Sequence, residues 1–117
     1  MKFAKKKRTT LQALDRKLWK LFSTFIRKRD CPNGWGKCIT CGKVKPYEEM
    51  DAGHFIGRRH KATKFDKKNV NGQCRYCNRF CSGESYAYGR AIDKKWGEGT
   101  AERLYTLSRA RGTRLTR

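Results

Sequence analysis

Asp51-Ala-Gly-His54, followed by Asn69-Val-Asn-Gly-Gln-Cys74-Arg-Tyr-Cys77-Asn78, is the stretch that decides the fold of this chain. It ends in a Cys-x-x-Cys knuckle, and a second knuckle, Cys38-Ile-Thr-Cys41, precedes it. Two such knuckles present four thiolates, which is the ligand set of a closed, tetrahedral, structural zinc site. We therefore predict that Cys38, Cys41, Cys74 and Cys77 hold one Zn²⁺, and that residues 42–73 carry structure of their own.

Two further cysteines, Cys31 and Cys81, leave two interpretations open. Either one of them replaces one of the four ligands, or both are small, buried side chains. We prefer the second interpretation.

Composition indicates a small nucleic-acid-binding domain. The chain has 117 residues, and 30 Lys and Arg against 10 Asp and Glu give a net charge of +20. That charge favours nucleic acid through the release of counterions. Only 37% of the residues are hydrophobic, so the core is small and a metal staple is expected. Charge alone fits a ribosomal or packaging protein as well as an enzyme.

The cysteines also bear on the compartment. The N-terminus, Met1 to Thr10, has no apolar run typical of a signal peptide, and no window is apolar enough to span a membrane. Paired knuckles in such a chain indicate zinc rather than disulfides. We expect a protein of the reducing cytoplasm with no membrane partner.

His54, Asn69 and Asn78 form a candidate hydrolytic site. Cleavage of a phosphodiester needs a base for water and a cation on the phosphate oxygens. An imidazole titrates near working pH, so His54 is the candidate base, and Asn69 on the facing strand is a candidate to orient it. The amide oxygen of Asn78 is a hard ligand that suits Mg²⁺ or Mn²⁺. The alternatives are that His54 is a zinc ligand or a buried structural histidine, and that the asparagines are turn and cap residues.

Basic residues crowd the segment between the two strands of this site. Phosphate contacts are expected from this loop and from the second knuckle, and the candidates are Arg58, Arg59, Lys61, Lys64 and Arg75. Charge balance and solubility are the alternative explanation of the same residues. No helix carries the clustered Asn, Gln and Arg of a base-reading element, so we expect low sequence specificity.

The rest of the chain supplies flanking elements. Apolar residues at helical spacing predict a helix up to about Arg29, with a capping box from Thr9 to Gln12, and we expect this stripe to form core. Strands are predicted over Met50–Ile56 and near Asn69–Gln73, with a helix starting in the second knuckle. Two more helices are expected at Tyr86–Trp96 and from a Thr100 cap to about Gly112. Residues 1–9 are a predicted basic arm, 10–112 the predicted domain and 113–117 a basic tail.

The order His54, Asn69, Cys74-x-x-Cys77-Asn78 resembles the HNH (His-Me finger) nucleases. That resemblance implies an α+β fold with a small ββα-metal core, in which a β-hairpin is followed by a helix. Many HNH members place Asp directly before the base histidine, whereas Gly53 stands there in this chain. Asp51-x-Gly53-His54 instead resembles the Asp-Arg-Gly-His motif of non-specific His-Me nucleases, in which an asparagine on the helix holds the metal. This implies that Asn78 is the principal metal ligand and leaves Asp51 as a second, tentative one.

A closer resemblance, over roughly residues 10–95, is to the NinG/Rap family of lambdoid phage recombination proteins. It rests on Cys-Ile-x-Cys-Gly, Asp-Ala-Gly-His-Phe, Asn-x-x-x-Gln-Cys-x-x-Cys-Asn and Ser-Gly, the last at Ser82-Gly83. It implies an endonuclease selective for branched DNA such as Holliday junctions and D-loops, in a phage-infected or lysogenic bacterial cell, with phage or host recombination proteins as further partners. Because junction resolvases act as symmetric pairs, we hypothesise a homodimer. The alternative is a non-catalytic, zinc-stapled accessory protein that binds nucleic acid in recombination or transcription.

Overall fold

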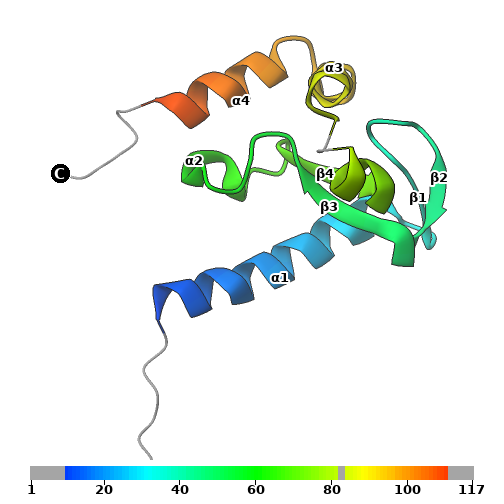
Figure 1. Ribbon diagram of the computed structural model, residues 1–117, viewed down its shortest axis with the longest axis horizontal. Coiled ribbons are helices and arrows are strands. Elements are labelled where there is room, and N and C mark those ends of the chain that lie inside the picture. Colours follow the sequence, from blue (N-terminus) through cyan, green and yellow to red (C-terminus); the bar gives the residue numbers. More distant parts are fainter. Residues whose placement is uncertain (1–9, 82–83, 111–117) are drawn as a thin grey trace, which may run out of the picture.

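Two antiparallel strands, β3 (Met50–His54) and β4 (Val70–Cys74), lie at the centre of the computed structural model (Figure 1). The structure describes residues 10–81 and 84–110. The predicted arm 1–9, the tail 113–117, Ser82-Gly83 and Thr9 of the predicted capping box lie outside the described residues. The strand predictions are confirmed, with β3 two residues shorter than expected. The architecture is a small α+β arrangement with two small antiparallel sheets.

The remaining elements follow in chain order around these strands. They are α1 (Leu11–Asp30), β1 (Trp35–Lys37), β2 (Val44–Pro46), the 3₁₀ turn η1 (Tyr47–Glu49), α2 (Lys61–Lys64), the short π-helix η2 (Tyr76–Phe80), α3 (Ser85–Trp96) and α4 (Thr100–Arg109). The helix η2 begins inside the second knuckle, as predicted. The short helix α2 lies in the segment that we expected to be a basic loop.

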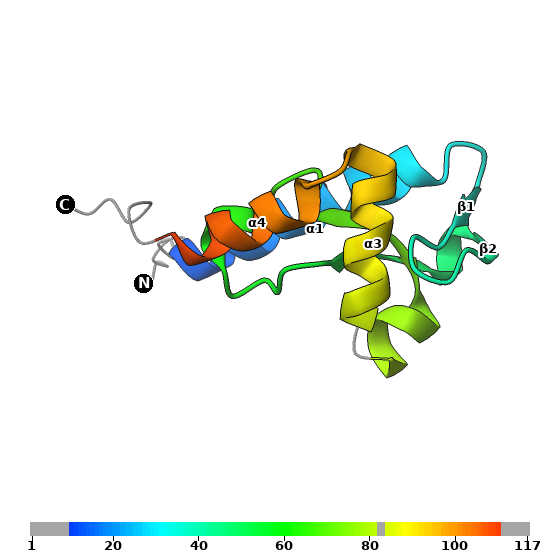
Figure 2. The same ribbon diagram turned by 90° about the horizontal axis from the view of Figure 1, so that it is seen from above.

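Helices cover both faces of the β3–β4 sheet. In Figure 1, α1 lies on one side of the strands and α3 and α4 lie on the other, while Figure 2 shows α3 running across the direction of α1. Tyr88 of α3 is fully buried; its hydroxyl donates to the Gly53 carbonyl and accepts from the backbone N–H of Asn71. These bonds fix α3 to the backbone of both strands, next to the apolar cluster of Ile56, Ile92 and Leu104.

The smaller sheet, β1–β2, carries the first knuckle in its connecting loop. The pairing runs from Trp35 opposite Pro46 to Lys37 opposite Val44. A backbone bond from Ile39 to the Gly72 carbonyl joins this loop to β4. The first knuckle is therefore held against the strand that ends in the second knuckle.

The apolar stripe of α1 does not form core in the way that we predicted. Ile26 is the one fully buried side chain of this helix, and Trp19 and Phe22 are partly buried against Phe65 and His54. The remaining large apolar residues are exposed to about half of their surface or more: Leu11, Leu14, Leu18, Leu21 and Phe25. The β3–β4 sheet is small and covers only one side of this wide apolar face, so the other side is exposed in the described structure.

The helix caps differ in detail from the predicted ones. Thr10 is the N-cap of α1, and its hydroxyl accepts from the Ala13 N–H at 3.0 Å. Gly99, with a φ of +91°, precedes α4 in place of the predicted Thr100 cap. The Asp93 carboxylate of α3 accepts from the Ala101 N–H at 2.8 Å, so α3 supplies the cap that α4 lacks. Among the helices of residues 10–81 and 84–110, none has the length and apolar character needed to span a membrane.

Candidate active site

The four predicted ligands, Cys38, Cys41, Cys74 and Cys77, converge on one point. Their sulfur atoms all lie within 4.8 Å of one another, and the Cys41 and Cys74 sulfurs are 3.9 Å apart. A tetrahedral zinc with Zn–S bonds of about 2.3 Å places its sulfurs about 3.8 Å apart. Four thiols at this spacing fit a structural metal ion, and zinc is the metal that this ligand set suits best.

The same crowding perturbs the thiols. Burial opposes ionisation of Cys38, but the N–H of Cys41 and the Thr40 hydroxyl outweigh it and lower the pKa of this thiol to about 6. Burial raises the pKa of Cys77 to about 12. Four thiolates therefore coexist here only with a cation to offset their mutual repulsion.

Cys31 and Cys81 stay outside this group among the described residues. Cys31 is buried, and a Cβ on Gly36 would lie 2.4 Å from its sulfur, so it fills space between α1 and β1. Cys81 is partly exposed just beyond η2. Neither residue replaces a ligand; Cys31 is buried as predicted, whereas Cys81 is partly exposed and not buried.

Asp51 of β3 and Asn78 of η2 meet directly beside the metal-binding group. The amide nitrogen of Asn78 donates to the Asp51 carboxylate at 2.9 Å. Arg79 donates to both carboxylate oxygens, at 3.0 and 3.3 Å, and Arg75 lies 3.8 Å from the nearer one. Because its nitrogen is bound to Asp51, the amide of Asn78 has its oxygen as the end able to meet a cation.

Gly53 makes room for this pair. A Cβ at this position would lie 2.2 Å from the side-chain oxygen of Gln73 and 3.0 Å from the amide oxygen of Asn78. Gln73 faces Asp51 across the strand pair, and its amide donates to Thr40 of the first knuckle at 3.2 Å. The absence of a side chain at Gly53 thus lets the strand, η2 and the metal-binding group pack together.

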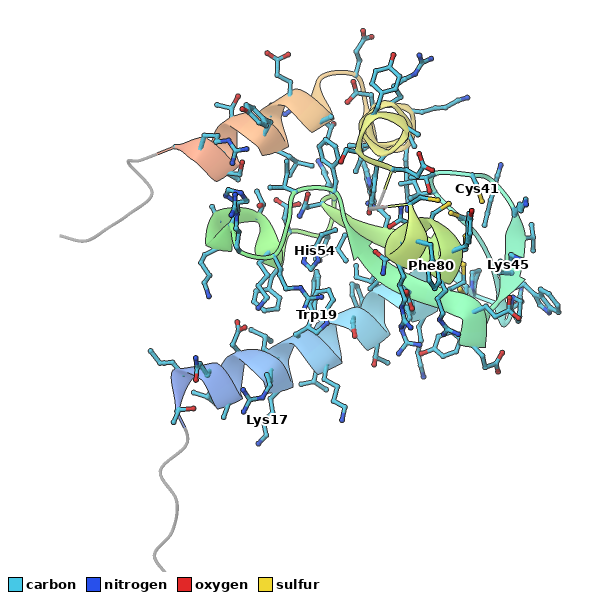
Figure 3. All side chains as sticks on the ribbon, viewed as in Figure 1. Lys17, Trp19, Cys41, Lys45, His54 and Phe80 are labelled. Atoms are coloured by element: carbon cyan, nitrogen blue, oxygen red, sulfur yellow. The ribbon has the colours of Figure 1, made fainter. Side chains whose placement is uncertain are left out.

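His54 is held in one orientation and in its neutral form. Its ring stacks on Trp19 of α1, and the two ring centroids are 4.7 Å apart. Figure 3 labels both side chains in the space between β3 and α1. Ring atom Nε2 lies 3.1 Å from the Lys64 carbonyl oxygen, so Nε2 carries the proton and Nδ1 presents the lone pair. Burial, together with the charges of Arg58 and Lys64, lowers the pKa of His54 to about 4.

The side chain of Asn69 bonds to the backbone of the segment that follows His54. It is fully buried; its amide oxygen accepts from the Ile56 N–H at 2.8 Å, and its nitrogen donates to the carbonyls of Ile56 and Thr63 at 3.0 Å. These bonds fasten the two ends of the segment that follows His54. The group that contacts the histidine ring is instead the Lys64 carbonyl, which a sequence motif cannot reveal.

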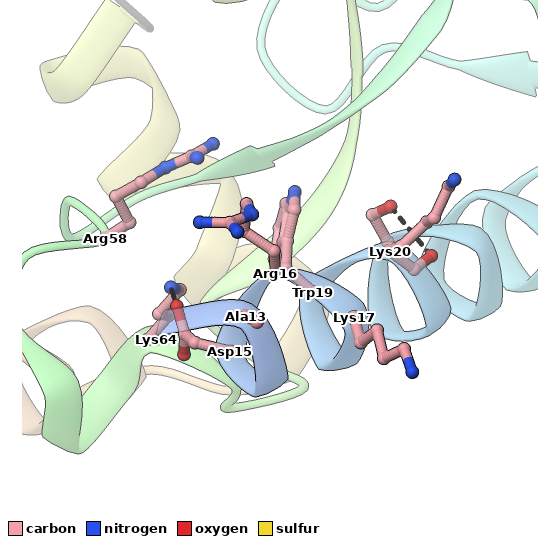
Figure 4. A pocket seen from close by; sticks show the side chains of 9 residues that line it. Ala13, Asp15, Arg16, Lys17, Trp19, Lys20, Arg58 and Lys64 are labelled. Atoms are coloured by element: carbon pink, nitrogen blue, oxygen red, sulfur yellow. Dashed lines mark hydrogen bonds and ion pairs between the residues drawn. The ribbon is translucent and has the colours of Figure 1, made fainter. Parts of the chain in front are cut away.

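Two adjoining hollows lie beside α1: one faces the segment after β3, and the other faces β3 and η2. One has a volume of about 690 Å³ and the other about 440 Å³, and both are lined by Trp19, Ser23 and Arg58. We call the two together the basic cleft, because each contains several cations and one carboxylate. Its basic residues are Arg16, Lys17, Lys20, Arg27, Arg58, Lys64, Arg75 and Arg79, and its carboxylates are Asp15 and Asp51. Figure 4 shows the larger hollow.

The predicted phosphate contacts divide into two groups. Arg58, Arg59 and Lys61 are exposed, and Arg75 is partly exposed. Lys64 is buried, and its ammonium group pairs with Asp15 of α1 (Figure 4), so it joins α2 to α1 rather than facing solvent.

The structure adds residues that sequence reasoning missed. Arg79 and the basic side of α1 line the cleft with Trp19. The recurrence of Arg16, Lys20 and Arg27 at spacings of one helical turn or its multiples was the available signal.

A comparison with protein families identifies the family of this chain. The model of the family described as bacteriophage lambda NinG protein matches residues 1–116. The chain belongs to the NinG family. This membership supports a bacteriophage origin. No curated protein matches the chain, and no solved structure does either.

Proposed function

We propose that this NinG-family chain is a metal-dependent DNA endonuclease with an HNH (His-Me finger) core, selective for branched recombination intermediates such as Holliday junctions and D-loops. The observation that carries the proposal is the contact between Asp51 of β3 and Asn78 of the following helix in the basic cleft. His54 lies on the same strand as Asp51 and stacks on Trp19, which lines that cleft. The strand pair β3–β4 followed by η2 has the order of a ββα-metal unit. The neighbouring cysteine group would hold the unit together through a structural Zn²⁺.

The oxygens around Asn78 fit a hard divalent cation. Mg²⁺ and Mn²⁺ take oxygen ligands and keep several waters, so one amide and one carboxylate suffice beside a phosphate. Asn78 is the proposed principal ligand, and Asp51 orients its amide and is the proposed second ligand. When bound, the cation would polarise the scissile phosphate and stabilise the leaving oxygen.

The protein's own groups carry the rest of the reaction. Nδ1 of His54 accepts the proton of the attacking water, since Nε2 is bound to the Lys64 carbonyl. Asn69 holds the backbone that positions this carbonyl. Arg75 and Arg79 line the same hollow as Asp51 and Asn78, and there they would stabilise negative charge that develops on the phosphate.

The basic cleft and the exposed Arg58, Arg59 and Lys61 would hold the flanking DNA backbone. Contacts of this kind read phosphates rather than bases, so they suit recognition of DNA shape. The proposed setting is a phage recombination system, with other phage or host recombination proteins acting on the same DNA.

One observation favours the second candidate, a non-catalytic zinc-stapled DNA-binding accessory. Arg79 and Asn78 together satisfy the charge of Asp51, as they would in a purely structural ion pair. In that case His54 and Asn78 would serve packing alone, and the cleft would bind DNA without cutting it.

Cleavage assays separate the two candidates. Labelled four-way junction, D-loop, flap and linear duplex DNA are incubated with wild type, His54→Ala and His60→Ala in Mg²⁺ or Mn²⁺. His60 is the matched control, because it is the other histidine of the chain and contacts Arg109 rather than the cleft. We expect wild type and His60→Ala to cut branched DNA, and His54→Ala to lose at least about 100-fold in rate. Tight binding without cleavage by wild type would favour the accessory protein.

A further inference from the structure

The exposed apolar residues of α1 have the spacing of a helix–helix seam. Leu11, Leu14, Leu18, Leu21 and Phe25 follow one another at alternating intervals of three and four residues. Their exposed fractions are 84%, 50%, 50%, 71% and 48%. We call this set the α1 seam. Alternating three- and four-residue spacing is the pattern by which two helices pack knobs into holes.

The α1 seam is separate from the candidate active site. The residues of α1 that line the basic cleft include Arg16, Trp19, Lys20 and Ser23, and none of the seam residues lines it. Figure 1 shows α1 as an outer layer of the described structure, with the sheet on its inner side. A partner on the seam would therefore leave open the smaller hollow, which contains Asp51 and Asn78. Asp15 and Lys17, which flank the seam, line the edge of the larger hollow.

We infer that the α1 seam is the contact surface between two copies of this chain. The terminal segments are poor occupants, because residues 1–9 and 111–117 are dominated by Lys, Arg and Thr. The α1 helix of a second copy presents the same α1 seam, so the two seams can pack against each other about a two-fold axis. The helix is already formed and held against the sheet, so association does not have to order it.

The flanks of the seam permit parallel packing of two copies. Lys17 and Thr24 lie on one flank, and Asp15 and Phe22 lie on the other. In a parallel pair each flank faces the opposite flank, offset by five residues, so Lys17 meets Phe22 of the second copy rather than another lysine. No like charges face each other over the part of the seam from Leu11 to Leu21.

The net charge gives this dimer an unusual salt dependence. Two copies of +20 repel one another, and added salt screens that repulsion while leaving apolar contact intact. Self-association should therefore strengthen with salt, whereas DNA binding weakens with salt. This inference does not depend on nuclease activity.

The test is sedimentation equilibrium of the zinc-loaded full chain without DNA, at about 0.1 M and about 1 M NaCl. We expect a mass that rises with salt and concentration from 13.7 kDa to twice that value. The double variant Leu14→Gln/Leu18→Gln should stay at the mass of one chain. Leu107→Gln, the same change at an exposed leucine of α4, should behave as wild type.

Circular dichroism and zinc content confirm that each variant is folded, and Leu21→Gln, at the more exposed Leu21, serves as a second seam variant. A wild type that stays at one chain under all conditions overturns the inference. A seam variant that dimerises as wild type does also overturns it, as does a mass above two chains. Cleavage by His54→Ala is measured separately, so failure of the dimer and failure of the nuclease are distinguishable.

Discussion

The imidazole of His54 lies between the indole ring of Trp19 and the Lys64 carbonyl, with Arg58 close by. Burial of the ring and the charges of Arg58 and Lys64 disfavour its protonated form and outweigh the Lys64 carbonyl, so the pKa of His54 falls to about 4. A base with a low pKa is present in its active form across the physiological range, although it is intrinsically weaker than one that titrates near 7.

The first prediction concerns this titration. The ordinary pKa of 6.5 applies to the unfolded chain, so the unfolded state binds a proton on His54 before the folded state does. Above pH 6.5 the ring is neutral in both states, and its titration does not change the free energy of unfolding. As the pH falls from 6.5 toward about 4, protonation of the unfolded state lowers the free energy of unfolding by a total of about 3 kcal/mol. Nitrogen-15 NMR of the ring should show the Nε2–H form down to about pH 4. A titration midpoint near 6.5 would contradict the structure.

Gly53 supplies the second prediction at the residue scale. Gly53→Ala places a methyl group against the side-chain oxygen of Gln73 and the amide oxygen of Asn78. Both side chains must shift, so we expect DNA cleavage to fall at least about tenfold, with zinc retained. Gly57→Ala is the matched control, since a Cβ there meets nothing within 4 Å. Equal cleavage by the two variants would show that the position of Asn78 is not critical.

At the scale of elements, α3 holds the sheet through one hydroxyl. Tyr88 is buried and joins the Gly53 carbonyl to the Asn71 N–H and side chain. In Tyr88→Phe these groups lose their shared partner, and we expect the free energy of unfolding to fall by about 1–3 kcal/mol in urea denaturation. Tyr86→Phe, at an exposed position of the same helix, should change it by less than about 0.5 kcal/mol. A similar decrease in the free energy of unfolding in both variants would mean that the hydrogen bonds of the Tyr88 hydroxyl do not stabilise the fold.

For the whole molecule, the four-cysteine group joins elements that have little core between them. Cys38 and Cys41 come from the β1–β2 loop, and Cys74 and Cys77 from β4 and η2. Removal of zinc by a chelator should abolish the cooperative thermal transition. Cys38→Ser should do the same, whereas Cys81→Ser should keep its zinc and its transition. An unchanged melting temperature after chelation would mean that the cysteines do not staple the fold.

The charge of the whole molecule makes DNA binding strongly dependent on salt. Each phosphate contact contributes a slope of about −0.9 to the logarithm of affinity against that of salt concentration. Lys20→Ala, in the basic cleft, should reduce the slope by about one contact, while Lys43→Ala, exposed but outside the cleft, should change it less. Equal slopes for both variants would indicate that DNA binds elsewhere.

The sequence by itself determined the parts of the molecule that depend on local spacing. The two knuckles predicted the metal-binding group. The resemblance to His-Me nucleases implied that Asn78 and Asp51 share a site, and the two side chains are in contact. The pairing of β3 with β4 and the start of η2 in the second knuckle bring Asp51 and Asn78 to the same end of the sheet. Family membership was also accessible from these motifs.

Only the tertiary structure decided which side of α1 is covered and what surrounds His54. An amphipathic pattern records where apolar residues lie, but not how much surface a distant sheet offers them. The stripe on α1 therefore predicted core at Leu14 and Leu18, which are half exposed. The stacking of Trp19 and the contact from the Lys64 carbonyl depend on packing between separate elements and on backbone atoms that every residue has. For that physical reason no spacing in the sequence could indicate them.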